Sequence, residues 1–323
     1  MKSRLTLIVP CFNEEPVIAS TAAQLCVVLD NLTRDNLISA DSNIIIVDDG
    51  SRDKTWKIIQ DLSNRDTRIN GVKLSRNSGH QNALLAGLEE ALQNGCDISI
   101  TIDADLQDDI AVIPQMIKRY HEGNEIIYGV RSGRQVDSAF KRKSADFFYH
   151  LMDKTDSPMI PNHSDFRLMS RNAMEMLMQF KERNLFLRGI VPLIGLNTAI
   201  VYYDRLPRTA GKSKYPLGKM ISFAIEGITS FSVRPIRMIF SIGLIFLILT
   251  LTVLIYVIAA ILLGRNIPGW ASIMLSIWFI GSLILMALGI IGEYVSKIYL
   301  ESKHRPRYFV EKRTNEKSGD KKI

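Results

Sequence analysis

The chain has 323 residues, a formal net charge of +7 and a mean hydropathy of +0.08. This length allows one or two domains, and the positive hydropathy argues against a purely soluble enzyme. The net charge suits either nucleic acid or an anionic membrane surface as a partner. Many basic residues flank the apolar last third of the chain, so a membrane is expected and nucleic acid is not; these residues are Arg234, Arg237, Lys297, Lys303, His304, Arg305 and Arg307.

The three cysteines, Cys11, Cys26 and Cys96, form no CxxC pair, and their number is odd. We therefore expect neither a disulfide framework nor a zinc site, and the cysteines suit a reducing compartment as small buried side chains. The apolar run after Arg4 is too short for a secretory signal. The N-terminal domain, residues 1–215, is accordingly expected to stay in the cytosol.

This N-terminal domain alternates short apolar runs with stretches of helical periodicity. The alternation predicts an α/β fold with a mostly parallel sheet covered by helices. The predicted strands are 5–9, 43–47, 71–74, 98–102 and 125–130, and the predicted helices are 15–32, 55–62, 83–93 and 113–122.

Polar residues follow three of these strands at the point where each strand ends. Residues 10–14 follow the first strand, residues 48–51 the second and residues 103–107 the fourth. Ligands of parallel sheets bind at the carboxyl ends of the strands. The three clusters are therefore expected to converge at one edge of the sheet.

Asp103 and Asp105 stand two residues apart directly after an apolar strand. Mg²⁺ or Mn²⁺ would relieve the repulsion between these carboxylates and bridge a diphosphate, and Gln107 can add a neutral oxygen. Such a cation would neutralise charge on a leaving phosphate. A lone DxD also occurs in ordinary loops, and it is the other strand-end clusters that favour the metal here.

Two acidic residues are candidates for contact with a nucleotide. Asp49, at the end of the second strand, can accept hydrogen bonds from a base or a ribose, and Glu14 can do the same. Each has an ordinary alternative, because Asp-Gly-Ser is a common turn, Asp53 can cap the next helix and Glu14 can be an acidic first-turn residue.

The last third contains two segments long and apolar enough to cross a membrane, 236–263 and 270–292, joined by a tight loop at 264–269. Basic residues lie before the first segment and after the second, whereas the loop has only Arg265. The positive-inside rule therefore predicts a multi-pass protein of the inner (plasma) membrane, with both termini and the basic tail 293–323 on the cytoplasmic side. A pair of buried core helices is the disfavoured alternative.

Two further segments are candidates for contact with the membrane surface. Residues 216–235 have apolar residues at helical spacing, which predicts an interfacial helix or, alternatively, a core helix of the soluble domain. Lys141, Arg142 and Lys143 stand beside phenylalanines and form either a membrane-facing patch or a solvated run of charges.

In their order and spacing, VPCFNEE, IIIVDDGS and DADLQDD resemble the inverting family-2 glycosyltransferases of the GT-A fold. GVRSGR, FKRKSADFFY, SDFRLMSR, RTAGKSKY and GEYVSKIYLESKHRPRYFV extend the resemblance over nearly the whole chain to the polyprenyl-phosphate glycosyltransferases. That group includes the bactoprenol glucosyltransferases of O-antigen modification and, more distantly, dolichol-phosphate mannose synthase. The chain departs from the pattern near Ser144 and Asp146, where the family often has a small hydroxyl residue after the basic pair.

The resemblance implies a role for each matching position. It implies nucleotide contacts from Pro10, Phe12, Glu14, Val47, Asp49 and Ala104, metal ligation by Asp103, Asp105 and Gln107, phosphate contacts from Arg131, Arg142, Arg208 and Lys214, and catalytic positions for Asp105, Arg131 and Asp165. Asp165 either positions the acceptor or acts as a base. A strong base is less necessary than for a sugar hydroxyl, because a lipid phosphate is largely ionised near neutral pH.

The resemblance also implies the reaction. It is inverting transfer of a hexose, glucose from UDP-glucose first of all, onto undecaprenyl phosphate, with Mg²⁺ or Mn²⁺ as cofactor, for a surface glycan or an O-antigen. The enzyme is expected to assemble as a homo-oligomer. The alternatives are UDP-N-acetylglucosamine as donor, a processive polysaccharide synthase (which usually has a QxxRW motif and more spans), a small transporter and a non-catalytic membrane scaffold.

Overall fold

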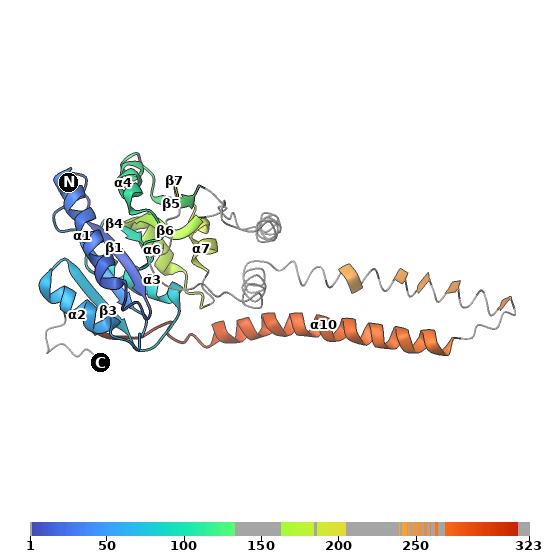
Figure 1. Cartoon of the computed structure of the whole chain (residues 1–323). Coiled ribbons are helices and arrows are strands. Elements are labelled where there is room, and N and C mark those ends of the chain that lie inside the picture. Colours follow the sequence, from blue (N-terminus) through green and yellow to red (C-terminus); the bar gives the residue numbers. More distant parts are fainter. Residues whose placement is uncertain are drawn as a thin grey trace. The chain divides into compact units, whose positions relative to one another are not determined.

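The computed structural model describes residues 2–132, 163–183, 186–204 and 269–315, together with single positions between 239 and 263. The chain divides into two compact units, which are described separately. The first comprises Met1–Pro216 and Arg305–Ile323, and the second comprises Leu217–His304. The first unit therefore contains the predicted domain 1–215 and, in addition, a segment from the other end of the chain (Figure 1).

An eight-stranded sheet forms the centre of the first unit, in the order β7-β5-β6-β4-β1-β2-β3-β8 among the described residues. β4, β1, β2 and β3 run parallel, β5 and β7 are parallel to each other, and β6 and β8 are antiparallel to their neighbours. The expected α/β fold with a mostly parallel, GT-A-like sheet is thus confirmed. The strands are Leu5–Cys11 (β1), Asn43–Asp48 (β2), Ile69–Leu74 (β3), Ile98–Thr101 (β4), Ile126–Arg131 (β5), His163–Ser170 (β6), Thr198–Tyr203 (β7) and Val310–Arg313 (β8).

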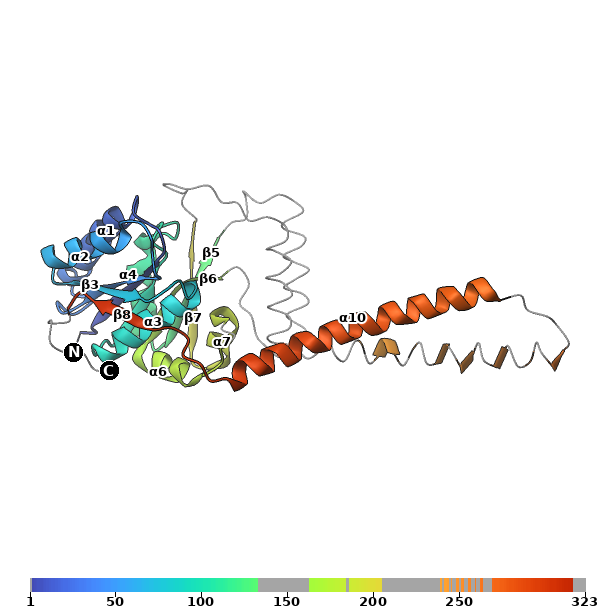
Figure 2. The same ribbon diagram turned by 90° about the horizontal axis from the view of Figure 1, so that it is seen from below.

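Helices cover both faces of this sheet, which is why β1 and β2 are buried along their whole length and lack the alternation of a half-exposed strand. Figure 2 shows α1 and α2 on one side of the sheet and α3 and α6 on the other. α4 packs into the same core cluster as α1. The helices are Ile18–Arg34 (α1), Thr55–Arg65 (α2), His80–Gln93 (α3), Ile113–His121 (α4), Arg171–Gln179 (α6) and Leu187–Leu193 (α7).

Gly87 allows α3 to lie directly on the central strands. A Cβ atom at this position would lie 2.3 Å from Cγ2 of Ile8 in β1 and 3.1 Å from Cγ2 of Val47 in β2. Any larger residue would push the helix away from the sheet. The close contact fixes the N-terminal end of α3, which carries His80, relative to the carboxyl ends of β1 and β2.

The C-terminal segment returns to the sheet as β8, although the sequence predicted only a basic tail at 293–323. β8 pairs with β3, and side chains reinforce the pairing: Arg313 Nε lies 2.8 Å from Glu90 Oε2 of α3, and Lys73 Nζ lies 3.0 Å from Glu311 Oε2. The Tyr308 hydroxyl also donates to Glu89 of α3. The tail is therefore part of the first unit's fold at least as far as residue 315.

The second unit contains one long helix among the described residues, α10 (Trp270–Ser302). Within it, Phe279–Ser302 is apolar enough to cross a membrane, and it is the one such segment that the described part of the chain contains. The predicted span 270–292 falls in α10, but the helix continues ten residues beyond the predicted end. The predicted interfacial helix 216–235 lies outside the described residues, as do half of the positions of the predicted span 236–263 and all of the loop 264–269 except Gly269.

Candidate active site

The carboxyl ends of β4, β1 and β2 lie side by side, as the polar clusters predicted. Hydrogen bonds join the loop after β1 to the loop after β2: Asn13 N donates to Ser51 Oγ (2.9 Å), and Arg52 N donates to Asn13 Oδ1 (2.9 Å). Glu14 N donates in turn to Thr55 Oγ1 at 3.0 Å. The two loops thus form one fixed edge of the site.

The loop after β4 carries the predicted metal ligands in a tight turn. Leu106 has a φ of 45°, a left-handed conformation that a leucine rarely adopts, and its N–H donates to Asp103 O at 3.1 Å. Gln107 N donates to Asp105 Oδ1 at 3.3 Å. The turn keeps Asp103, Asp105 and Gln107 together at the end of one strand, at a cost in backbone strain.

The electrostatics of Asp103 fit a cation. Loss of solvation in the site raises the pKa of Asp103 to about 6, and the nearby carboxylates of Asp108, Asp165 and Asp105 act in the same direction. Among the described residues no three His, Cys, Asp or Glu side chains form a metal-binding group. A metal here would therefore use the two carboxylates, the neutral Gln107 and oxygens of its ligand, a hard donor set that suits Mg²⁺ or Mn²⁺.

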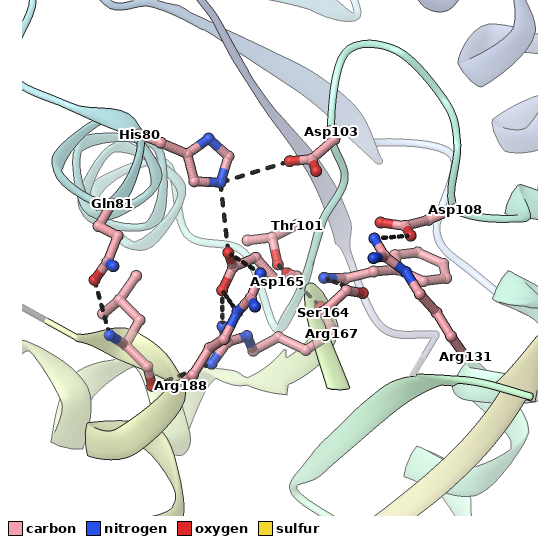
Figure 3. A network of polar contacts seen from close by, with 12 residues as sticks. His80, Gln81, Thr101, Asp103, Asp108, Arg131, Ser164, Asp165, Arg167 and Arg188 are labelled. Carbon is pink, nitrogen blue, oxygen red and sulfur yellow. Dashed lines mark hydrogen bonds and ion pairs between the residues drawn. The ribbon is translucent and has the colours of Figure 1, made fainter. Parts of the chain in front are cut away.

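Asp165 is the centre of a second group of charges (Figure 3). It lies on β6, and its Oδ1 accepts from Arg167 Nη2 at 2.6 Å. Arg188 of α7 donates through Nε to Oδ1 (3.3 Å) and through Nη2 to Oδ2 (3.1 Å). His80 Nε2, at the start of α3, lies 3.6 Å from Asp165 Oδ2 and 3.5 Å from Asp103 Oδ1. His80 therefore connects this group to the predicted metal ligands.

These partners bear on the two roles considered for Asp165. Burial by itself would raise the pKa of Asp165, but the contact with His80 and the charges of Arg188 and Arg167 outweigh it and hold the pKa well below its usual range. A carboxylate this acidic is a poor proton acceptor near neutral pH. The geometry thus favours a fixed anion that positions its neighbours over a general base.

Arg131, at the end of β5, is oriented by a separate group. Its Nη2 lies 3.1 Å from Oδ1 of the buried Asp108, and its Nε donates to the Tyr203 hydroxyl at 3.3 Å. The same hydroxyl donates to Asp108 and lies 2.8 Å from Ser164 Oγ. Arg131 is thereby held as a cation at the same end of the sheet as Asp103, where a phosphate contact was predicted.

The predicted nucleotide residues fall into two groups. Phe12 is 39% exposed in the loop after β1, and the half-buried Glu14 begins the turn into α1 through its carbonyl oxygen. Pro10 and Val47 lie within β1 and β2 and are buried, with Val47 directed at α3 near Gly87.

Asp49 and Ala104 make structural contacts at the edge of the site. Both carboxylate oxygens of Asp49 accept backbone N–H groups, from Ser78 at 2.6 Å and from Gly79 at 2.9 Å, and so fix the loop that leads into α3. The Ala104 carbonyl accepts from Thr21 Oγ1 at 2.6 Å. These contacts account for the burial of both residues without a ligand.

Three predicted phosphate contacts, Arg142, Arg208 and Lys214, lie outside the described residues. Five residues of the two charge groups were not predicted from the sequence: His80, Asp108, Arg167, Arg188 and Tyr203. A signal existed for His80, because polar residues follow the third predicted strand just as they follow the other three. Arg167 could have been found by its spacing of two from Asp165, which places both on one face of a strand. No comparable signal marks Arg188.

Comparison with known proteins identifies the family of the chain. The sequence profile described as "Glycosyl transferase family 2" matches residues 6–177, more than half of the chain. An uncharacterized glycosyltransferase, YkoT of Bacillus subtilis, is 52% identical over 95% of this chain and 91% of its own. The bactoprenol glucosyl transferase of Shigella phage SfV is 39% identical over 95% of this chain and 98% of its own.

Among solved structures, mannosyl-3-phosphoglycerate synthase from Rubrobacter xylanophilus matches over 70% of this chain and 72% of its own, with 13% identity and a TM-score of 0.47. The assignment of the chain to a family follows from the sequence profile and from the sequence relatives. On those grounds the chain belongs to glycosyl transferase family 2 and is a glycosyltransferase.

Proposed function

We propose that this glycosyltransferase transfers a hexose from a UDP-sugar onto a polyprenyl phosphate, with inversion at the anomeric carbon, and that glucose is the sugar. The observation that carries the proposal is the site itself, where a carboxylate loop suited to a metal–diphosphate lies beside the cations Arg131 and Arg188. An anionic donor and an anionic acceptor need both kinds of group. The lipid and the sugar are suggested by relatives named bactoprenol glucosyl transferase, which align over nearly the full chain.

In this proposal an oxygen of the lipid phosphate bonds to the anomeric carbon as the bond from that carbon to the β-phosphate oxygen breaks, so UDP leaves. Asp103, Asp105 and Gln107 would hold Mg²⁺ or Mn²⁺, which supplies positive charge to the leaving diphosphate when bound. Arg131 supplies further charge from the other side. The attacking phosphate is already ionised, so no residue need remove a proton, in agreement with the low pKa of Asp165.

For the nucleotide, we propose that the exposed Phe12 and the half-buried Glu14 contact the base and ribose, and that Asp49 and Ala104 shape the pocket through the backbone that they hold. Pro10 and Val47 support that pocket from within the strands. Arg142, Arg208 and Lys214 remain proposed contacts of the phosphates. A homo-oligomer remains a proposal on the resemblance alone.

Connectivity supports a two-span topology. The chain leaves the first unit after residue 216 and returns to it at residue 305, where the segment leading to β8 begins. A segment that starts and ends in one folded domain must cross a membrane an even number of times. If α10 crosses once, a second crossing is needed between 217 and 269, where the predicted span 236–263 lies. We propose that the catalytic unit lies on the cytoplasmic side.

The topology is tested by single added cysteines in intact cells. A cysteine at Asn266 should react with a membrane-impermeant maleimide from outside, and one at Lys317 should react only after permeabilisation. The unaltered chain measures the background from Cys11, Cys26 and Cys96. Protection of Asn266 from outside, with labelling after permeabilisation, would contradict two crossings.

The reaction is tested by incubating the purified full-length chain with Mn²⁺, undecaprenyl phosphate and labelled UDP-sugars, including UDP-glucose and UDP-N-acetylglucosamine. We expect label from UDP-glucose in the lipid fraction, dependent on metal. Transfer from UDP-N-acetylglucosamine alone would correct the sugar. Absence of transfer from every donor, by protein that binds UDP, would contradict the proposed acceptor.

A further inference from the structure

The geometry points to Arg188 as a phosphate-binding residue of the active site. The inference rests on the proposed function for the identity of the phosphate, which is either the acceptor's phosphate or the diphosphate of the donor. Arg188 is not one of the phosphate contacts that were predicted from the sequence.

The backbone beside Arg188 is fixed from two sides. Leu187 N donates to Gln81 Oε1 of α3 at 2.9 Å, and Leu187 O accepts from Arg167 Nη1 of β6 at 3.4 Å. Gln81 directly follows His80, the residue that contacts both Asp103 and Asp165. The start of α7 is therefore held in place by the same two elements that carry the centre of the site (Figure 3).

Arg188 and Arg167 share the carboxylate of Asp165 but differ in exposure. The Arg167 side chain is 3% exposed, whereas the Arg188 side chain is 42% exposed. Arg167 is thus the buried partner that neutralises Asp165. Arg188 is anchored by the same carboxylate, and its side chain remains partly exposed.

Two guanidinium groups, those of Arg167 and Arg188, bind the one carboxylate of Asp165. The bonds of Arg188 to Asp165 use Nε–H and one N–H of Nη2. Of the five N–H groups of an arginine, this leaves the two on Nη1 and one on Nη2. Among the described residues, the side-chain hydrogen bonds that the structure gives to Arg188 go to Asp165, through Nε and Nη2.

An anion of the right shape would complete this arrangement. A guanidinium presents parallel N–H groups that match two oxygens of a phosphate, and the Asp165 anchor fixes the plane of that fork before a ligand arrives. His80 separates the anchor from Asp103 by two contacts of 3.5 and 3.6 Å, so a phosphate on Arg188 would lie next to the proposed metal–diphosphate. Arg119, by contrast, pairs with Glu122 at the surface, where the two side chains are 48% and 42% exposed.

The test compares Arg188→Gln and Arg188→Lys with Arg119→Gln as a matched control, because Arg119 is 48% exposed and also paired with a carboxylate. Each full-length variant is assayed by calorimetry for binding of UDP and uridine with Mn²⁺ and of farnesyl phosphate, and by transfer kinetics. Thermal unfolding checks the fold, which should survive because Asp165 keeps Arg167. Arg188→Lys keeps the charge but lacks the fork.

Loss of one charge-assisted contact should weaken phosphate binding about 10-fold to 100-fold in Arg188→Gln, with a smaller loss in Arg188→Lys and none in the control. Weaker UDP binding with unchanged uridine binding would assign Arg188 to the donor diphosphate. A raised KM for the lipid and weaker farnesyl phosphate binding, with unchanged UDP binding, would assign it to the acceptor. Folded Arg188→Gln protein that binds both ligands within twofold of the unaltered chain would overturn the inference. The binding assays give this answer even if no sugar is transferred, so the inference and the proposed reaction fail separately.

Discussion

Arg167 Nη2 lies 2.6 Å from Asp165 Oδ1, and the two side chains are only 3% and 12% exposed. They stand two residues apart on β6 and so share one face of the strand. Removing one member of a buried ion pair leaves the other charge without compensation and costs about 3–5 kcal/mol. Asp165→Asn should therefore lower the free energy of unfolding as well as the rate of transfer.

Thermal unfolding in detergent checks this prediction. Glu175→Gln is a suitable control, because it breaks the exposed pair between Glu175 and Arg171, which should be worth less than about 1 kcal/mol. Equal shifts of the unfolding midpoint in the two variants would show that the Asp165–Arg167 pair is not a structural element.

The pH dependence of the reaction separates a fixed anion from a base. The pKa of Asp165 is held well below its usual range. A depressed pKa means that the stabilisation from this carboxylate is present above its unfolded pKa and is lost only as the pH falls through the lower, folded value. Between pH 5 and 9 the kcat/KM profile should show no ionisation of Asp165. The residual activity of Asp165→Asn should keep an acidic limb, displaced to lower pH because the Asp165 carboxylate helps to raise the pKa of Asp103. Disappearance of an acidic limb in that variant would restore the general-base role.

The loop after β4 is tested by metal-dependent binding. Asp105→Asn and Asp103→Asn should weaken Mn²⁺-dependent binding of UDP at least about tenfold, because each would remove one of the two charged ligands proposed for the metal. Asp109→Asn is the matched control from the same loop, where the carboxylate only caps a short helix through Ala111 N. Calorimetry with and without EDTA makes the measurement. UDP binding that is unaffected by EDTA in the unaltered chain would contradict a metal site here.

Because β8 belongs to the first unit, a deletion of the membrane-spanning part should keep β8. Ending the chain after Ser302 deletes β8 and with it the pairs Arg313–Glu90 and Lys73–Glu311, and it exposes the edge of β3. We expect this truncation to lower the unfolding midpoint of the catalytic unit, whereas replacing residues 217–304 by a flexible linker should not. Limited proteolysis of the two forms compares them. Equal protease resistance would show that β8 does not stabilise the sheet.

The linker form also tests whether the membrane-spanning part contributes to catalysis. The linker form should keep UDP binding but lose activity on long-chain lipid relative to a short-chain prenyl phosphate, because tethering raises the effective concentration of membrane-bound acceptor. Undiminished activity of that form on undecaprenyl phosphate in vesicles would argue against a catalytic contribution of the anchor.

The first five strands and the helices between them were predictable because their signals are local. Apolar runs that end in polar clusters mark the strands, and the parallel order brings Asp103 and the loops after β1 and β2 to one edge. β8 was not predictable, because Val310–Arg313 has only four residues, of which three are charged, and pairs with β3, which lies more than two hundred residues earlier. A strand of that kind owes its structure to its partner, not to its own pattern.

The partners of Asp165 could not be predicted from the sequence, for a related reason. The motif SDFRLMSR indicated that Asp165 is important, but its acidity depends on Arg188 and His80, which come from two other elements. Electrostatic shifts of this size follow from distances in the folded chain. The sequence left base and positioning residue as alternatives, and the geometry favours the second.

The most direct test of the central claim is the mass of the lipid product. Undecaprenyl phosphate is incubated with UDP-glucose, Mn²⁺ and the purified full-length chain, and the lipid is extracted and analysed by mass spectrometry. We predict that the lipid gains the mass of one hexosyl residue. Asp105→Asn should abolish this gain, and Asp109→Asn should preserve it. Unchanged lipid with UDP-glucose consumed, or a product formed equally well by Asp105→Asn, would contradict the central claim.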